Sequence, residues 1–397
     1  MSSRKTVVAT AAGAAALALA VGLGAVFTPD AEAEVDSAAS GCHTSGIYEV
    51  CVASPEQYDD GLDATIVDKL REYVQAAGEG DSIRGAVFEW EMDDRAPQIK
   101  GLVDDLVAAK TERGVDVKII LDDRSRNSEV IKTFDANGMV ELCDGGCLPH
   151  EYDDKAGVMH MKSFTFSTGG ELKVAHTSSN LTYAQLKRHE NLITVNGDKK
   201  LYDSYLGFWN RMAVGSWTYD GETWDGREFN GDAQGLKSYF FPRPSGDPVP
   251  ATLDNPSCEG DNDKVWVAHS LFTEHRPGTL KQLDELRSEG CDVRVILSRE
   301  EDRDWVLANS DLDPDSVRLL DGKTGDPDLE WNSHHNKLIV TNALYDGKDR
   351  PAVYGGSHNL NLNELRRSSD AMLRVVDQGV YDVFADYYAS MFDLAHT

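Results

Sequence analysis

Apolar residues alternate along the chain between helical spacing and the short unbroken runs that are typical of buried strands. The first helical face has apolar residues three and four positions apart, namely Ile66, Val67, Leu70, Tyr73, Val74 and Ala77. Residues 82–90 then form an apolar run of strand length. A second helical face, made of Ile99, Leu102, Val103, Leu106 and Val107, ends at Gly114, and residues 115–121 predict the next strand.

The same succession of patterns returns in the second part of the chain. Residues 264–272 and 292–297 predict strands, and a helical face between them ends at Gly290. The segment Gly-Val-Asp-Val-Lys-Ile-Ile-Leu at 114–121 matches Gly-Cys-Asp-Val-Arg-Val-Ile-Leu at 290–297 nearly position for position. We therefore interpret the chain as a tandem repeat of two similar halves.

Each half ends in a helical stretch whose apolar face is rich in aromatic residues. In the first half this face consists of Leu201, Tyr202, Tyr205, Phe208, Trp209 and Met212. In the second half it consists of Val380, Tyr381, Phe384, Tyr387, Tyr388, Met391 and Phe392. We expect both faces to be core. The alternation of strand and helix predicts an α/β fold in which each half is a sandwich with a mixed sheet, and the halves pack about a pseudo-two-fold axis with the active site at their interface.

The repeat sets the expected domain boundaries. Residues 34–215 form the first half, residues 236–397 form the second, and residues 216–235, which are rich in Gly, Asp and Thr, link them. Three aromatic residues stand in this link, namely Trp217, Tyr219 and Trp224. They either pack on the surface, which is the reading we favour, or form a lip at the headgroup level of a lipid surface, where Trp and Tyr are enriched.

Residues 1–33 have the pattern of a secretory signal peptide. Two basic residues precede an apolar, alanine-rich run at 7–27, and small residues suitable for cleavage follow at 31–33. The alternative is an uncleaved membrane anchor, which is less consistent with the polar stretch that follows the run directly. We therefore expect a secreted, extracellular protein.

The cysteine content and the charge agree with an extracellular chain. All 6 cysteines follow residue 33, and an even count in an exported protein predicts disulfides. We favour the pairing of near neighbours, which gives Cys42–Cys51, Cys143–Cys147 and Cys258–Cys291. A zinc site on Cys143 and Cys147 is the alternative. The formal net charge of −29 suits a soluble protein and opposes, without forbidding, binding to nucleic acid or anionic membranes.

Two polar motifs recur at matching places in the two halves. Of the 11 histidines, only His160 and His335 have a lysine two residues on, at Lys162 and Lys337. Each motif is followed by a β-prone stretch, then a Ser-x-Asn, and then an acidic residue. The candidate site residues are His160, Lys162, Ser178, Asn180 and Glu190 in the first half, and His335, Lys337, Ser357, Asn359 and Asp370 in the second.

This combination of side chains suits a phosphate group. Residues i and i+2 of a strand point the same way, so His-x-Lys places an imidazole and an ammonium on one face, and Ser-x-Asn does the same with a hydroxyl and an amide. Two facing sets would hold phosphate oxygens, while one imidazole attacks and the other transfers protons. A metal site built from His160, His334, His335 and His358 is the alternative, which the neighbouring lysines oppose because an ammonium repels a bound cation.

The paired motifs resemble those of the phospholipase D superfamily, in which His-x-Lys-x4-Asp and Gly-Ser-x-Asn each occur twice. The resemblance extends over nearly the whole chain after residue 33, because the halves repeat. Ser167 and Asn342 stand at the positions of the family's aspartates, and Thr177 replaces the glycine before Ser178. Those aspartates are understood as structural in the family, so the reacting groups are retained here.

The resemblance implies a phosphodiesterase that hydrolyses the headgroup-side phosphodiester of a phospholipid, such as phosphatidylcholine, to phosphatidic acid and choline. It also implies transfer of the phosphatidyl group to other alcohols. On this hypothesis His160 attacks phosphorus and forms a phosphohistidine, and His335 protonates the leaving group. The lysines and asparagines hold phosphate oxygens with support from the serines. Glu190 and Asp370 each orient the histidine of their own motif.

The resemblance also sets the expected partners and the competing functions. No metal or cofactor is expected, the partner is a phospholipid at a membrane or micelle surface, and the protein is expected to be a monomer. A secreted endonuclease of the same superfamily would need a basic track, and the sequence shows only scattered arginines such as Arg366 and Arg367. A degenerate phosphate-binding module would account for Ser167 and Asn342, but both histidines and both lysines are intact.

Overall fold

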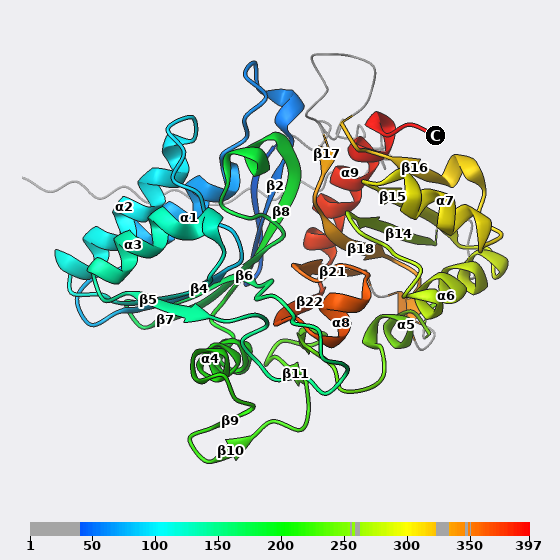
Figure 1. The fold of residues 1–397 in the computed structure, drawn as a ribbon. Helices are drawn as coiled ribbons and strands as arrows, with labels where there is room; N and C mark the ends of the chain where they lie inside the picture. The colour runs from blue at the N-terminus through cyan, green and yellow to red at the C-terminus, as the bar shows by residue number, and fades with distance from the viewer. Residues whose placement is uncertain (1–39, 255, 259–262, 323–332, 346–347, 350) are drawn as a thin grey trace, which may run out of the picture. The chain divides into compact units, whose positions relative to one another are not determined.

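Two mixed sheets with the same strand order form the framework of the protein (Figure 1). They confirm the predicted α/β fold with two similar halves. The computed structural model describes residues 40–397 except 255, 259–262, 323–332, 346–347 and 350. The predicted signal peptide at 1–33 therefore lies outside the described residues.

The first sheet has the strand order β1-β2-β8-β7-β6-β3-β4-β5. Its strands are β1 (Gly41–Ser45), β2 (Tyr48–Ala53), β3 (Ser82–Val87), β4 (Asp116–Asp122), β5 (Val140–Cys143), β6 (Lys162–Thr168), β7 (Glu171–Thr177) and β8 (Arg188–Asn196). The pairs β3–β4 and β4–β5 are parallel, and the other neighbours are antiparallel. The last four residues of β4 are all buried, as the unbroken apolar run at 115–121 predicts.

The second sheet has the order β11-β12-β22-β21-β18-β14-β15-β16. Its strands are β11 (Glu228–Asn230), β12 (Lys237–Phe241), β14 (Lys264–His269), β15 (Asp292–Leu297), β16 (Val317–Leu319), β18 (Lys337–Thr341), β21 (Ala352–Gly356) and β22 (Asp370–Val376). The short strands are β9 (Thr218–Tyr219), β10 (Glu222–Thr223), β13 (Pro256–Ser257), β17 (Ser333–His334), β19 (Leu344–Tyr345) and β20 (Lys348–Asp349). The run β22-β21-β18-β14-β15-β16 repeats β8-β7-β6-β3-β4-β5 in order and polarity. The repeat seen in the sequence is therefore a repeat of topology.

Helices cover both faces of the sheets (Figure 1). They are α1 (Thr65–Ala76), α2 (Pro97–Thr111), α3 (Ser128–Ala136), α4 (Lys199–Val214), α5 (Pro248–Leu253), α6 (Pro277–Ser288), α7 (Glu300–Ala308), α8 (Leu362–Arg366) and α9 (Gln378–Leu394). Helices α1, α2 and α3 share one apolar cluster with the first sheet, and α5, α6 and α7 share another with the second. Among the helices of the described residues, none has the length and apolar character needed to cross a bilayer.

The two closing helices, α4 and α9, join the halves through one apolar cluster that contains residues of both sheets. Helix α4 contacts β7 and β12, and α9 contacts β2 and β21, so each touches strands of both sheets. The hydroxyl of Tyr387 on α9 lies 3.1 Å from the carbonyl oxygens of Ala53 and Glu190. The aromatic faces are core, as predicted, and they are the core that the halves share.

The predicted link at 216–235 contains structure of its own. β9 and β10 form a hairpin, and β11 extends the second sheet by pairing with β12. Trp224 is only 8% exposed and packs against Phe208 and Phe240, so it lies in the core and not on the surface, where we expected it to pack. Helix α4, which carries Phe208, and strand β12, which carries Phe240, bring these rings together, and the polar composition of the link gave no sign of this.

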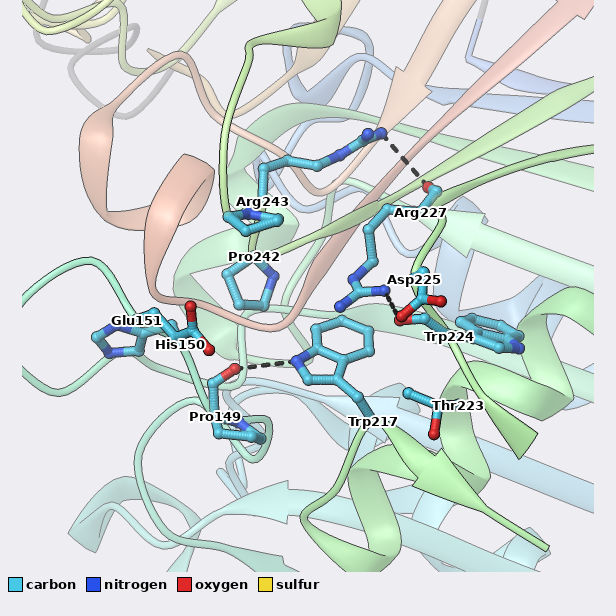
Figure 2. Close-up of a pocket in the computed structure, with 11 residues that line it drawn as sticks. Pro149, His150, Glu151, Trp217, Thr223, Trp224, Asp225, Arg227, Pro242 and Arg243 are labelled. Carbon is cyan, nitrogen blue, oxygen red and sulfur yellow. Dashed lines mark hydrogen bonds between the residues drawn. The ribbon is translucent and has the colours of Figure 1, made fainter. Parts of the chain in front are cut away.

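A pocket of about 330 Å³ lies beside the link, apart from the motif residues (Figure 2). Trp217 lines it and donates its indole N–H to the carbonyl oxygen of Pro149 at 2.9 Å. The guanidinium of Arg227 stacks over the Trp217 ring at 3.4 Å. Tyr219 is 38% exposed. Trp217 therefore packs on the surface, as in the reading we favoured, whereas Trp224 belongs to the core.

The cysteines form the three predicted disulfides, Cys42–Cys51, Cys143–Cys147 and Cys258–Cys291, and none in the described part of the chain is free. The first bridges the hairpin of β1 and β2, where Cys42 and Cys51 are directly opposite. The third ties the segment before β14 to the start of β15. The alternative zinc site on Cys143 and Cys147 is thereby excluded in this state.

We predict that removing the Cys258–Cys291 bridge lowers the melting temperature more than removing Cys42–Cys51. Loops of 33 and 9 residues are closed, and the chain-entropy model gives about 3.7 and about 2.6 kcal/mol respectively. Double serine variants compared by thermal unfolding would measure the difference. Several free thiols in the unfolded, unreduced protein would contradict the pairing.

Candidate active site

The backbone around each motif histidine is bonded to the opposite half. The N–H of His160 donates to the carbonyl oxygen of Ser369 at 2.8 Å, and the N–H of Ser369 donates to that of Val158 at 3.1 Å. In the mirrored arrangement β17 pairs in parallel with β8, and the N–H of His335 donates to the carbonyl oxygen of His189 at 3.0 Å. Each histidine therefore lies beside the residue that precedes the other half's acid.

The acids and histidines pair across the interface. The Nδ1 atom of His160 lies 3.0 Å from Oδ2 of Asp370, and Nδ1 of His335 lies 3.0 Å from Oε1 of Glu190. Our expectation that each acid orients the histidine of its own motif is wrong. The start of each acid's strand pairs with the segment that carries the other half's histidine, and this determines which ring the carboxylate meets.

The two serines of the Ser-x-Asn motifs bind these carboxylates. The hydroxyl of Ser178 donates to Oε2 of Glu190 at 2.5 Å, and the hydroxyl of Ser357 donates to Oδ1 of Asp370. Both serines are fully buried. Their predicted support of phosphate oxygens is thus indirect in this structure, because each proton is already used to fix a carboxylate.

The two lysines are buried and fold back onto their own motifs. Lys162 donates from Nζ to the carbonyl oxygen of His160 at 2.7 Å, and Lys337 donates to that of His335 at 2.5 Å. Lys337 also donates to Oγ of Ser270 at 3.2 Å. Burial lowers the pKa of Lys162 to about 8 and that of Lys337 to about 7, although nearby carboxylates oppose the shift. The histidines precede β6 and β18, and the lysines begin them, so the predicted alignment of both on one strand face is incomplete.

The two asparagines differ in how they are held. Asn359 accepts from Oγ of Ser270 at 2.9 Å and donates to Oε1 of Glu364 at 3.0 Å. Asn180 is 4% exposed, and its Oδ1 atom has no hydrogen-bond partner among the described residues. One amide is therefore anchored, while the other keeps a buried acceptor that a ligand or water could satisfy.

A cavity of about 470 Å³ opens onto both motif histidines. It is lined by Phe88, Val158, His160 and Arg188 of the first half and by Ser270, Leu271, Ser298, Arg299, Asp321, Ser333, His334, His335, Asn359 and Glu364 of the second. The ring of Phe88 packs against that of His160 at a centroid distance of 4.9 Å. The structure thus brings the predicted residues together at one site, with the histidines and Asn359 at the surface of the cavity and the acids and serines behind them.

Residues 71–212 match a family described as "Cardiolipin synthase, PLD-like domain". The matched residues lie within the first half of the chain. No curated protein matches the chain by sequence.

Solved structures show where the same fold occurs. Phosphatidylserine synthase of Haemophilus influenzae is 14% identical with a TM-score of 0.57, over 89% of this chain and 88% of that one. Polyphosphate kinase of Porphyromonas gingivalis is 12% identical with a TM-score of 0.52, over 86% of this chain, which spans 50% of the kinase. Nuc of Salmonella typhimurium, a phospholipase D family member, is 24% identical over 41% of this chain and 91% of that one, with a TM-score of 0.30. The first two share the fold of this chain.

The two acid–histidine pairs of this site are electrostatically unequal. Burial raises the pKa of Glu190 to about 7 against the opposing effects of Lys337 and Ser178. Burial would also raise the pKa of Asp370, but His160 and His358 beside it hold that pKa well below its usual value. Burial and the charge of Lys337 lower the pKa of His335 well below its usual value. The site is nearly symmetric in geometry and clearly asymmetric in charge.

Sequence reasoning missed a further repeated pair, Gln185 and Glu364. Each follows the asparagine of its Ser-x-Asn motif by five residues, a spacing that could have revealed it. Oε1 of Glu364 lies 3.6 Å from Nδ1 of His160, and the Gln185 amide, with its nitrogen toward Glu190, lies 3.2 Å from Nδ1 of His335. Arg188, Ser270 and Phe88 were also missed, and no spacing marks them.

The positions that depart from the superfamily pattern lie away from the cavity. Ser167 sits on β6 opposite Ser82 of β3, and Asn342 follows β18. Oδ1 of Asn342 accepts from the backbone N–H of Lys264 at 2.7 Å and so anchors the start of β14. Its role is structural, as the resemblance implies.

One group of residues in the described chain could hold a metal ion by distance alone. The possible ligand atoms of His160, Glu364 and Asp370 lie within 4.8 Å of one another. The alternative set named from the sequence does not assemble in this way, since only His160 belongs to both groups. The charges of Asp370 and Glu364 oppose the lowering of the Lys162 pKa by burial, so this ammonium lies in the field of the same carboxylates. We assign no metal to this group.

We predict that Lys337→Met removes activity but raises the melting temperature. The folded pKa of about 7 lies below the unfolded value of about 10.5, so the folded protein binds fewer protons between these pH values and stability rises with pH there. The burial penalty is therefore fully present below pH 7 and fades toward pH 10.5. The gain in melting temperature of Lys337→Met should therefore be largest below about pH 7 and should fade toward about pH 10.5.

The matched control is Lys162→Met. Its folded pKa of about 8 is closer to the unfolded value, so we expect a smaller gain at pH 6. Thermal unfolding of both variants and the wild type from pH 6 to pH 10 measures the effect. A Lys337→Met protein that is less stable than the wild type at pH 6 would contradict the prediction.

Proposed function

We propose that the protein is a secreted phosphodiesterase of phospholipase D type, which cleaves the headgroup-side phosphodiester of a phospholipid. The observation that carries this proposal is the pair of imidazoles on one cavity, each with Nδ1 held by a carboxylate of the opposite half. Neither Nε2 atom has a hydrogen-bond partner among the described residues, so both remain for chemistry. The three disulfides fit an oxidising, extracellular compartment.

In the proposed reaction one imidazole is the nucleophile and the other transfers protons. Nε2 of His160 attacks phosphorus, a P–N bond forms and the bond to the headgroup oxygen breaks, while His335 gives its proton to that oxygen. Water or another alcohol then loses a proton to His335 and attacks phosphorus, and the P–N bond breaks. Hydrolysis gives phosphatidic acid, and attack by an alcohol gives transfer.

The assignment of roles follows the superfamily resemblance and must accommodate the charge asymmetry. In the free protein the lowered pKa of His335 disfavours the imidazolium that an acid requires. A bound phosphodiester adds a negative charge beside the ring of His335, which raises the pKa of that ring. Proton uptake by His335 on substrate binding is therefore part of the proposal.

The lining of the cavity favours a zwitterionic substrate. Arg188 and Arg299 can meet the phosphate, while the carboxylates of Glu364 and Asp321 can meet a cationic headgroup such as choline. Glu364 is 5% exposed, and its Oε2 atom has no hydrogen-bond partner among the described residues. A nucleic acid would bring many negative charges to a chain of net charge −29. Phosphatidylcholine is therefore the substrate we propose.

We predict choline release from phosphatidylcholine vesicles that persists in excess EDTA. The lysines and arginines of the site supply the positive charge that a metal would otherwise provide. Phosphatidylcholine, sphingomyelin and plasmid DNA assayed side by side provide the test, with His160→Ala as the inactive control. Cleavage of DNA without lipid would replace the proposal by the endonuclease, and inactivity on all three would favour a phosphate-binding module.

We predict a covalent adduct on His160. In His335→Asn the second step should be slowed by orders of magnitude, because the residue that activates water is absent. Brief reaction with substrate, a quench in base and mass spectrometry of the peptides would locate the phosphorus. An adduct on His335 of the wild type would reverse the two roles.

A further inference from the structure

A buried histidine outside the motifs lies behind His160. His176, on β7, is fully buried, and its Nε2 atom lies 3.0 Å from Oγ of Ser357 in the other half. Its Nδ1 atom lies 2.8 Å from the hydroxyl of Tyr205. Ser357 in turn binds Asp370, and Asp370 binds His160. A continuous chain of hydrogen bonds therefore runs from Tyr205 to His160.

The position of each proton follows from counting donors. A carboxylate only accepts, so the proton between Ser357 and Asp370 belongs to the serine. The serine has no second proton, so it accepts from His176, whose Nε2 must carry hydrogen. A neutral imidazole then has a bare Nδ1, which accepts from Tyr205. At the far end Asp370 accepts from Nδ1–H of His160.

Burial keeps the imidazole of His176 neutral. Burial lowers its pKa to about 4, which the charge of Asp370 opposes and that of Lys162 reinforces. Burial also raises the pKa of the Tyr205 hydroxyl, which therefore keeps its proton. All the donors thus point in one direction, toward Asp370.

This chain of hydrogen bonds matters because two imidazoles compete for one carboxylate oxygen. Oδ2 of Asp370 lies 3.0 Å from Nδ1 of His160 and 3.7 Å from Nδ1 of His358. Oδ1 is held by Ser357 and by the backbone N–H of Ala371 at 2.9 Å. Fixing Oδ1 sets the rotation of the carboxylate and so directs Oδ2 to His160.

The other acid–histidine pair, Glu190 and His335, is supported differently. Ser178, which corresponds to Ser357, accepts from the backbone N–H of Asn191 at 2.9 Å instead of from a side chain. The backbone of Gly356 makes room for the imidazole, since a Cβ atom there would lie 2.5 Å from Cε1 of His176. Only the pair of Asp370 and His160 is thus supported by a further histidine.

We propose that His176 is a positioning residue, which acts through Ser357 and Asp370 to hold His160 as the Nδ1–H tautomer with its Nε2 lone pair available for attack. This inference deepens the proposed function and rests on it, because the Nε2 lone pair has a role only if His160 is the nucleophile. The tautomer itself can be measured without any substrate.

The first measurement is ¹⁵N NMR of the free, histidine-labelled protein, with signals assigned from His160→Asn and His176→Leu. We expect hydrogen on Nδ1 of His160 and on Nε2 of His176 in the wild type. In His176→Leu the ring of His160 should become a mixture of tautomers, and in His176→Gln, whose amide can still donate to Ser357, it should keep the wild-type form. Hydrogen on Nδ1 of His176 in the wild type would overturn the proposal even if His176→Leu does not fold.

The second measurement is turnover by the same variants. We expect His176→Leu to lower kcat by about tenfold with little change in KM, as for the loss of one hydrogen bond that matters mainly in the transition state. His176→Gln should recover most of the rate. Equal losses in both variants at matched melting temperatures would show a merely structural role. A wild type that cleaves no phosphodiester would refute the proposed function, and the NMR result would still decide the tautomer.

Discussion

The crossed pairing of acids and histidines is the interaction on which the rest of the site depends. Neither half contains a complete pair, because the partner of His160 is Asp370 and the partner of His335 is Glu190. A carboxylate 3.0 Å from a ring nitrogen allows little error in how the halves dock. The backbone bonds of His160 to Ser369 and of His335 to His189 set that register.

The shared core makes this docking stable. The aromatic faces of α4 and α9 lie in one apolar cluster with both sheets, and burying each large apolar side chain contributes about 1.5–3 kcal/mol. Against this gain stand buried charges such as Lys162 and Lys337, whose lowered pKa values show that their surroundings disfavour the ammonium. A site that must hold these charges away from water needs a large apolar interface around it. The fusion of two halves into one core supplies that interface.

The duplication gives a symmetric frame, and the side chains around it make the two histidines different. Glu190 has a raised pKa and a serine satisfied by a backbone amide, whereas Asp370 has a lowered pKa and a serine satisfied by His176. A two-step transfer needs one imidazole that is neutral while the other is charged. Asymmetry built onto a repeated frame is therefore consistent with the division of labour in the proposed reaction.

Periodicity and repetition were sufficient to predict much of this protein from its sequence. The apolar spacing of α1, α2, α4, α6 and α9 and the match of 114–121 with 290–297 are local properties, and they predicted two α/β halves. The ten polar residues of the site followed from two repeated motifs, and the disulfides followed from proximity. The sequence spacing of Gln185 and Glu364 held a further signal of the same kind.

Only the tertiary structure decided which residues meet across the interface. His160 and Asp370 are 210 positions apart, and His176 and Ser357 are 181 apart. Strand periodicity determines the face of a sheet on which a side chain lies, but it carries no information about which strand of the other half docks opposite. That choice depends on how α4 and α9 pack between the sheets. The crossed acids, the buried serines and the role of His176 therefore follow from the packing of the two halves.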